Sequence, residues 1–188
     1  MSGRAPTAIV SSPKYTAALR EIPQTIEVIP RKVIEEQGIT TLNDALRNVP
    51  GITLQAGEGG GACNTAGDMF TLRGFNAANS LFVDGVRDDG LISRDVFNLE
   101  QVEVLMGPTG SDVGRGTAAG CVNLQSKSPR PTSGASTLFS YGNADQKRLT
   151  VDLNHALPLG APGHWLGRSA LRLKGLWQER PLGGDGTA

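Results

Sequence analysis

The order of apolar and polar residues divides the chain into three regions. Residues 1–22 have no regular period and contain Pro6 and Pro13, which favours a flexible N-terminal arm. Residues 23–130 carry short periodic segments separated by turn residues, whereas residues 131–188 carry longer alternating segments. We therefore expect an arm, a compact domain and a group of antiparallel strands, in this order.

The periods in the second region predict a mixed α/β domain. Residues 31–38 have helical spacing and end at Gly38, and residues 41–49 form a second helix that Thr40 or Thr41 can cap. Apolar and polar residues alternate along residues 102–106 and 121–125, which predicts strands with one buried face. Short strands are expected at 25–29, 52–55, 70–73, 80–84, 102–106 and 121–125.

The third region predicts about three strands with one apolar and one polar face. Alternating segments run through residues 136–141, 148–154 and 171–178. Segments of about ten residues with this alternation are typical of transmembrane β-barrels. Soluble antiparallel sheets share the same period, so the pattern alone leaves both possibilities open.

Composition narrows the function classes. Lys plus Arg and Asp plus Glu each number 18, so the charge balance gives no indication of nucleic acid as a partner. No apolar run reaches the roughly 18 residues of a membrane-spanning helix, and the start lacks the apolar core of a signal peptide. Cys63 and Cys121 fit no zinc spacing, and either two separate thiols or a disulfide remains possible.

No catalytic chemistry emerges from the motifs. Residues 57–62, GEGGGA, fit a dinucleotide fingerprint, but the helix that must follow it is absent. The glycine-rich loop at residues 107–120 lacks the closing Gly-Lys-Ser/Thr of a P-loop. His155 and His164 both lie in the strand region, away from any nucleophile motif. We therefore expect no enzyme, no metal site and no cofactor.

Six motifs in a fixed order resemble a known family. They are TIEVIP, LNDALRNVPGI, FTLRGF, LFVDGVRD, VFNLEQVEVLMGPTG and GRGTAAGCVNLQSKSP, with NTAGD and SRD between them. Over about residues 8–130 the chain resembles the plug domain of TonB-dependent outer-membrane receptors, and within them the catecholate-type siderophore receptors. The glycine-rich loop is then expected to be plug architecture rather than a ligand site.

The resemblance implies a fold and a location. It predicts an α+β plug domain at residues 23–130, with a small mixed sheet and short helices. Antiparallel strands of an incomplete transmembrane β-barrel follow at residues 131–188. A complete barrel of about 22 strands needs several hundred more residues. We therefore expect a fragment of a receptor in the cell outer membrane, with the plug inside the barrel and the arm of residues 1–22 in the periplasm.

The resemblance also implies partners. We expect a ferric siderophore as the transported ligand, outer-membrane lipid around the barrel, and TonB, the inner-membrane protein that energises uptake. A TonB box at Thr7, Ala8, Ile9, Val10 and Ser11 would pair with TonB as an added strand. The alternatives are a family member for haem, cobalamin or another cargo, and a plug-like periplasmic binding module.

Motif positions imply the site residues. The ligand is expected to contact five residues in the apical plug loops: Arg73, Arg87, Asp88, Leu91 and Phe97. Arginine offers charge, forked donors and stacking to an anionic, aromatic ferric catecholate. Alternatively, these arginines pair with nearby aspartates and order the loops. Glu103 and Arg115 are expected to form structural salt bridges between plug and barrel.

Overall fold

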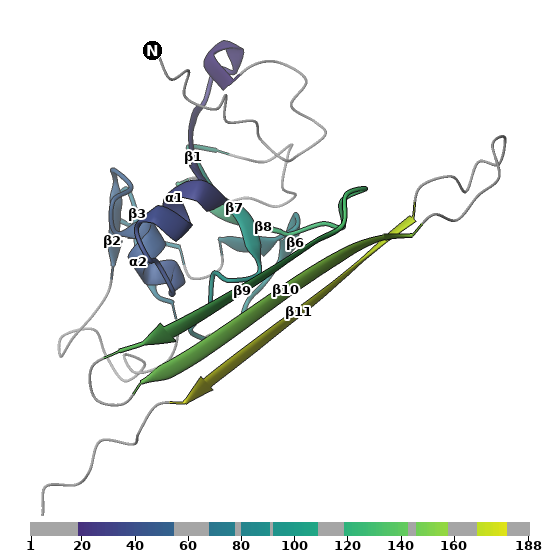
Figure 1. The fold of residues 1–188 in the computed structure, drawn as a ribbon. Coiled ribbons are helices and arrows are strands. Elements are labelled where there is room, and N and C mark those ends of the chain that lie inside the picture. Colours follow the sequence, from purple (N-terminus) through teal and green to yellow (C-terminus); the bar gives the residue numbers. More distant parts are fainter. Residues whose placement is uncertain are drawn as a thin grey trace, which may run out of the picture. The chain divides into compact units, whose positions relative to one another are not determined.

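The computed structural model describes residues 19–54, 68–77, 80–90, 92–108, 119–142, 146–157 and 169–179 (Figure 1). The chain divides into two compact units, Met1–Lys127 and Ser128–Ala188. Each unit is described by itself below.

The first unit is a mixed α/β domain built on a five-stranded sheet. Its central part pairs β7 antiparallel with both β1 and β8, while β5 runs parallel to β8. The sheet order is β1-β7-β8-β5-β6, and a second small sheet has the order β2-β3-β4. The elements are η1 (Leu19–Glu21), β1 (Thr25–Pro30), α1 (Arg31–Glu36), α2 (Leu42–Leu46), β2 (Ile52–Leu54), β3 (Phe70–Leu72), β4 (Phe75–Asn76), β5 (Leu81–Val83), β6 (Val86–Arg87), β7 (Leu99–Met106) and β8 (Gly120–Ser126).

The two predicted helices are present, with the expected glycine after α1 and the expected threonine cap before α2. Gly38 follows α1 with a φ of 63°, a conformation that glycine adopts without a steric cost. The side chain of Thr41 caps α2 by accepting a hydrogen bond of 3.2 Å from the Asp44 amide. α2 ends at Leu46, three residues before the predicted end. Across the described ranges, no helix has the length and apolar character needed to cross a membrane.

Both faces of the β7–β8 pair are buried, so the prediction of half-buried strands is wrong. Val102, Val104 and Val122 point into the main core together with α2 and β3. On the opposite face, Leu105 and Cys121 form a second cluster with Phe82 and Ile26. The polar residues that alternate with them are buried too: Glu103 is 1% exposed and Asn123 6% exposed.

Two hairpins with two-residue turns were missed by the sequence analysis. Arg73 and Gly74 connect β3 to β4, and Asp84 and Gly85 connect β5 to β6. All four residues have positive φ, between 50° and 82°, as the favoured type I′ hairpin turn requires. Asp84 is stabilised in this conformation because its carboxylate accepts a hydrogen bond of 2.8 Å from the Ser126 amide.

The second unit is a three-stranded antiparallel sheet with β10 in the middle. The strands are β9 (Gly134–Tyr141), β10 (Lys147–Leu157) and β11 (Ser169–Glu179), in the order β11-β10-β9. The pairing places Leu149 opposite both Phe139 and Trp177. One face therefore collects large apolar residues that remain exposed: Phe139, Tyr141, Leu153, Leu171, Leu173 and Trp177. The prediction of three strands with one apolar face is confirmed for the described residues.

Gly120 tests the close packing of the β7–β8 pair. Its φ is 124°, and an added Cβ would lie 2.0 Å from the Leu105 carbonyl oxygen. We expect Gly120→Ala to lower the free energy of unfolding of the first unit by about 3 kcal/mol. Urea unfolding followed by far-UV circular dichroism measures this change.

The matched control is Gly107→Ala. Gly107 also has a positive φ, 99°, but an added Cβ would meet no atom of the described residues within 4 Å. We expect this substitution to cost about 1 kcal/mol, from backbone strain alone. Equal losses in the two variants would contradict the close backbone approach at Gly120.

Candidate functional site

The open ends of the two hairpins are joined by a single buried arginine, Arg94. Asp68 lies just before β3, and Asp88 lies just after β6, so both sit at the ends opposite the two turns. Arg94 forms an ion pair with each of them, with nitrogen–oxygen distances of 3.6 Å to Asp68 and 2.9 Å to Asp88. Its side chain is only 9% exposed.

Arg94 also holds the loop that leads from β6 to β7. Its guanidinium donates hydrogen bonds to the carbonyl oxygens of Gly90, at 2.6 Å, and Ile92, at 3.0 Å. The Arg94 carbonyl accepts a hydrogen bond of 3.0 Å from the Leu42 amide at the start of α2. One residue therefore links both hairpins, Gly90 and Ile92 of the following loop, and a helix.

Asp68 is the most deeply buried member of this cluster, with a fully buried side chain. Its Oδ2 atom accepts a hydrogen bond of 2.8 Å from the Arg94 amide, whereas Oδ1 has no hydrogen-bond partner among the described residues. Burial raises the pKa of Asp68, and the Arg94 amide and guanidinium partly offset that effect. The ionised form of Asp68 therefore depends on Arg94.

Asp88 lies at the edge of the cluster. Its carboxylate accepts hydrogen bonds of 3.1 Å from the Gly90 amide and 3.0 Å from the Arg94 side chain. The Gly90 amide, followed by Arg94, lowers the pKa of Asp88, although burial acts in the opposite direction. This predicted ligand residue thus orders its own loop together with Arg94, an arginine that the sequence analysis did not consider as its partner.

The remaining predicted ligand residues are not all brought together. Arg87, in β6, is exposed and lies with its guanidinium 5.5 Å from the ring centre of Phe82. Phe97 is half-buried, and its amide donates to the Asp95 carboxylate. Arg73 occupies the β3–β4 turn, at the end of the hairpin opposite Asp68, where its guanidinium lies 4.0 Å from the Met106 sulfur. Leu91 lies outside the described residues.

Glu103 takes part in a buried polar network inside the first unit. Its carboxylate accepts hydrogen bonds from Asn123, at 3.0 Å, and from Gln101, at 2.6 Å. Asn123 in turn accepts a hydrogen bond of 3.0 Å from the Gly85 amide, which connects β7 and β8 to the β5–β6 turn. Arg115 and the predicted TonB box at residues 7–11 lie outside the described residues, so their roles stay predictions.

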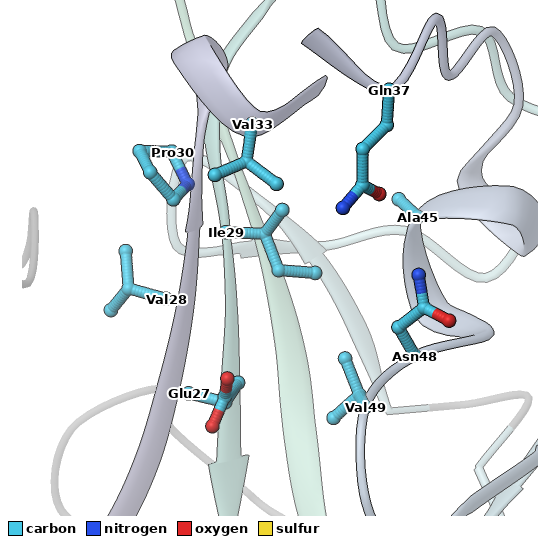
Figure 2. Close-up of a pocket in the computed structure, with 9 residues that line it drawn as sticks. All are labelled: Glu27, Val28, Ile29, Pro30, Val33, Gln37, Ala45, Asn48 and Val49. Carbon is cyan, nitrogen blue, oxygen red and sulfur yellow. The ribbon is translucent and has the colours of Figure 1, made fainter. Parts of the chain in front are cut away.

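A separate pocket of about 220 Å³ opens between β1, α1 and α2 (Figure 2). Apolar side chains such as Ile29, Val33 and Val49 share its walls with the polar side chains of Gln37 and Asn48. It contains none of the predicted site residues. In the part of the chain that the structure describes, no group of three or more His, Cys, Asp or Glu side chains could hold a metal ion. Cys121 is fully buried, and Cys63 lies outside the described residues.

Residues 18–121 match the family model described as TonB-dependent Receptor Plug Domain. These residues make up more than half of the 188-residue chain, and the chain belongs to the TonB-dependent receptor plug family. The family is one of receptors and transporters rather than of enzymes. Its fold here is the predicted one, a mixed sheet with short helices followed by antiparallel strands.

Similar proteins are much longer than this chain. The probable TonB-dependent receptor BfrD of Bordetella pertussis is 47% identical over 146 residues, which cover 78% of this chain and 19% of that protein. The catecholate siderophore receptor Fiu of Escherichia coli K12 is 44% identical over 148 residues, with the same coverage of 78% and 19%. The chain therefore spans about a fifth of the length of these relatives.

A solved receptor structure has the same fold. The crystal structure of the ferric-catecholate import receptor Fiu from E. coli K12, in its open form, aligns with a TM-score of 0.74 and 36% identity. The alignment covers 90% of this chain and 23% of that chain. Proteins of this kind are outer-membrane proteins.

Two residues of the cluster, Arg94 and Asp68, were not among the predicted site residues. A usable signal was present around Arg94, because Asp88, Gly90 and Arg94 lie on one short loop where an arginine can reach a carboxylate and free carbonyls. Asp68 could not be paired with Arg94 in this way, because the two are distant in sequence and meet only through the fold.

Substituting Arg94 tests its role in ordering the loops. We expect Arg94→Ala to lower the free energy of unfolding of the first unit by about 3 kcal/mol, because Asp68 stays buried without its partner. Arg94→Lys restores less than half of this loss, since one ammonium group cannot reproduce the forked donors. Urea unfolding measures stability, and hydrogen exchange of residues 88–92 measures loop order.

Arg87→Ala is the control, because Arg87 directly precedes Asp88 at the end of β6 but is exposed. Its contact with Phe82 contributes about 0.5–1 kcal/mol, so a small change is expected. Full stability of Arg94→Lys with unchanged exchange of residues 88–92 would show that charge alone matters, against the present interpretation.

Proposed function

We propose that the chain is the N-terminal part of an outer-membrane receptor for the energised uptake of ferric siderophores of the catecholate class. The observation that carries this proposal is the match of residues 18–121 to the plug family. The similarity to Fiu of E. coli K12, a catecholate siderophore receptor at 44% identity, supports the ligand class. The ferric siderophore is the cargo of this transport.

Apart from Arg73, the proposed ligand contacts lie in or next to the loop that Arg94 orders. Arg87 offers an exposed guanidinium beside an aromatic ring, which suits an anionic ligand with aromatic catechol groups. Asp88 holds its loop in place through Arg94, and we propose that Leu91 and Phe97 supply apolar contact. A contact between Arg73 and the ligand is a separate proposal, because β3 lies between Arg73 and the Arg94 cluster.

The exposed apolar face of the second unit supports the proposal that this unit lies in a membrane. Phe139 is 63% exposed, Leu173 58% and Trp177 51%, and all three lie on the same face of the sheet. A periplasmic module surrounded by water would rarely expose a continuous apolar face of this kind. We propose that the face contacts outer-membrane lipid and that the plug lies inside the barrel formed with the remaining strands.

We further propose TonB as the energising partner. The segment Thr7-Ala8-Ile9-Val10-Ser11 would bind TonB as an added strand, with backbone hydrogen bonds supplying most of the affinity. This proposal rests on the position of the segment, ahead of the plug in a periplasmic arm, and on the name of the family.

Uptake of radioactive iron tests the proposal. The longer gene that encodes this chain is expressed in a Gram-negative host without catecholate receptors of its own, and a ferric catecholate is supplied. We expect saturable uptake that disappears when TonB is deleted, while surface binding remains. Arg87→Ala should raise the half-saturation concentration about tenfold, the equivalent of one charge-assisted hydrogen bond.

Arg47→Ala is the control, because Arg47 is exposed beside α2 and pairs with Asp44, away from the Arg94 cluster. It should leave both the rate and the half-saturation concentration unchanged. Uptake of haem or cobalamin instead of iron would move the proposal to another cargo of the same family. Absence of any TonB-dependent uptake would refute it.

A further inference from the structure

The two carboxylate oxygens of Asp68 have different surroundings. Oδ2 accepts a hydrogen bond of 2.8 Å from the Arg94 amide, whereas Oδ1 has no hydrogen-bond partner among the described residues. The contact between Oδ2 and the Arg94 guanidinium, at 3.6 Å, is longer than a hydrogen bond. When Asp68 is ionised, a fully buried charge therefore has one oxygen that no described group stabilises, and such an oxygen costs more in a charged carboxylate than in a neutral carboxyl group.

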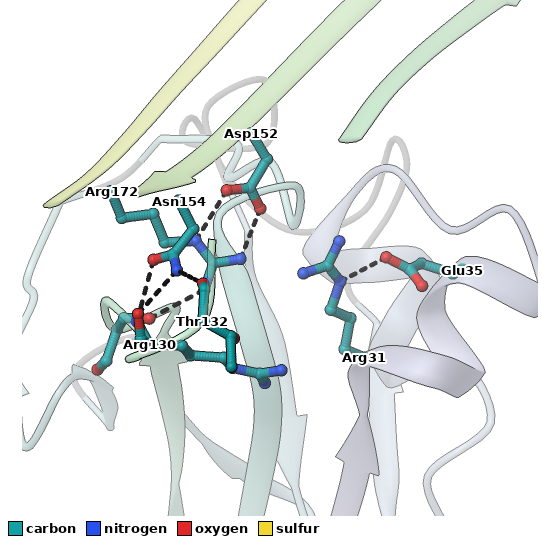
Figure 3. A network of polar contacts seen from close by, with 8 residues as sticks. Arg31, Glu35, Arg130, Thr132, Asp152, Asn154 and Arg172 are labelled. Carbon is teal, nitrogen blue, oxygen red and sulfur yellow. Dashed lines mark hydrogen bonds and ion pairs between the residues drawn. The ribbon is translucent and has the colours of Figure 1, made fainter. Parts of the chain in front are cut away.

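Asp152, in the second unit, shows how a buried aspartate looks when both oxygens are paired (Figure 3). Its Oδ1 and Oδ2 atoms accept hydrogen bonds from two nitrogens of Arg172 in β11, at 2.8 Å and 2.6 Å. The Arg172 side chain is 7% exposed and the Asp152 side chain 10%. Two charge-assisted hydrogen bonds thus hold that carboxylate. Asp68 has no second bond of this kind to lose when it takes up a proton.

The contacts that hold the loop around Gly90 and Ile92 do not need a charge on Asp68. The Asp68 amide donates a hydrogen bond of 3.2 Å to the Ile92 carbonyl, and a neutral carboxyl group still accepts a hydrogen bond through Oδ2. The Arg94 guanidinium keeps its ion pair with Asp88, at 2.9 Å, and its hydrogen bonds to the Gly90 and Ile92 carbonyls. A proton on Oδ1 therefore changes the charge and leaves these contacts in place.

This part of the chain carries more negative than positive groups. Residues 87–95 contain three aspartates and two arginines, a formal charge of −1, and Asp68 brings the total to −2. A surplus of negative charge opposes the approach of an anion. One proton on Asp68 halves this surplus.

The charged neighbours of Asp68 are few among the described residues. Arg94 contacts it directly, and Asp88 lies on the other side of the same guanidinium. The helix α2 begins beside the Arg94 carbonyl, and its Asp44 forms an ion pair of 3.3 Å with Arg47.

The two carboxylates on Arg94 respond to acid in opposite ways. Burial raises the pKa of Asp68 more than the Arg94 amide and guanidinium lower it. The Gly90 amide, followed by Arg94, lowers the pKa of Asp88. As the pH falls from neutrality, Asp68 therefore takes up its proton above the ordinary aspartate pKa of about 3.9, while Asp88 stays ionised on Arg94.

We propose that Asp68 is a charge switch beneath the loop of Asp88, Gly90 and Ile92, one that takes up a proton on Oδ1 without displacing Arg94 from that loop. The loop then holds an anion more tightly in mild acid than at neutral pH. The switch itself stands on the geometry around Asp68, whereas its effect on a ferric catecholate rests on the proposed function.

The first experiment tests the switch in the full 188-residue chain in detergent, without ligand. NMR follows the carboxyl carbons of labelled aspartates from neutral pH into acid, and Asp88 is the internal control. We expect Asp68 to titrate above about pH 3.9 and Asp88 below it. Exchange of the Gly90 and Arg94 amides, corrected for the intrinsic effect of pH, should not change through the Asp68 step. Titration of both groups at the ordinary value, or loss of amide protection during the Asp68 step, would overturn the switch.

The second experiment measures the affinity of the longer receptor for a ferric catecholate, from slightly alkaline pH down to the midpoint found for Asp68. The unchanged receptor and Asp68→Asn are compared at each pH, so that changes in the ligand itself cancel. In the alkaline range we expect Asp68→Asn to bind about fivefold more tightly, the effect of removing one partly screened charge. This difference should shrink toward the Asp68 midpoint.

Asp89→Asn is the matched control, because Asp89 is an exposed carboxylate in the same loop. It should give a smaller gain in affinity that stays the same over this pH range, since solvent screens its charge. A gain in Asp68→Asn that does not change with pH, or no gain at all, would contradict the switch.

The two proposals can fail separately. If neither the unchanged receptor nor the variants bind a ferric catecholate, the proposed function is refuted and the titration result stands. If the unchanged receptor binds it and Asp68→Asn makes no difference at any pH, the switch is refuted and the cargo assignment stands.

Discussion

The pairing of β7 with β8 is the constraint on which the first unit depends. Both faces of this pair are buried, so every residue along it must either pack or find a polar partner. Glu103 meets that demand through Asn123 and Gln101, and Asn123 also fixes the β5–β6 turn. Gly120 permits the close backbone approach at the end of the pair. The β5–β6 hairpin takes its position from this pair, because β5 runs parallel to β8.

Two arginines, one in each unit, hold irregular backbone in the same way. Arg94 is fixed by Asp68 and Asp88 and binds the carbonyl oxygens of Gly90 and Ile92. Arg172 is fixed by Asp152 and binds the Ser128 carbonyl. In each case a carboxylate immobilises the guanidinium, whose remaining donors hold an irregular backbone that lacks a strand or helix to pair with. The backbone at Gly90, Ile92 and Ser128 is thereby held by polar contacts rather than by a hydrophobic core.

Sequence reasoning recovered what depends on local period and order. The helix ends at Gly38 and Thr41, the alternation in β9–β11 and the family motifs are all local signals, and the structure and comparisons confirm them. Three features escaped because they depend on contacts distant in sequence. These are the second buried face around Leu105, the pairing of Asp68 with Arg94, and the attachment of Arg130 to Asn154 of β10. The short hairpins were missed although Arg-Gly and Asp-Gly form their turns, because their strands have only two or three residues.

The central functional claim is that the loops ordered by Arg94 receive the ligand. The most direct test is a structure of the longer receptor with a ferric catecholate bound. The account predicts that the ligand lies against residues 87–92, with the Arg94 ion pairs intact beneath it. A ligand that makes no contact with residues 87–92, or one that replaces Arg94 on Asp88, would contradict the account.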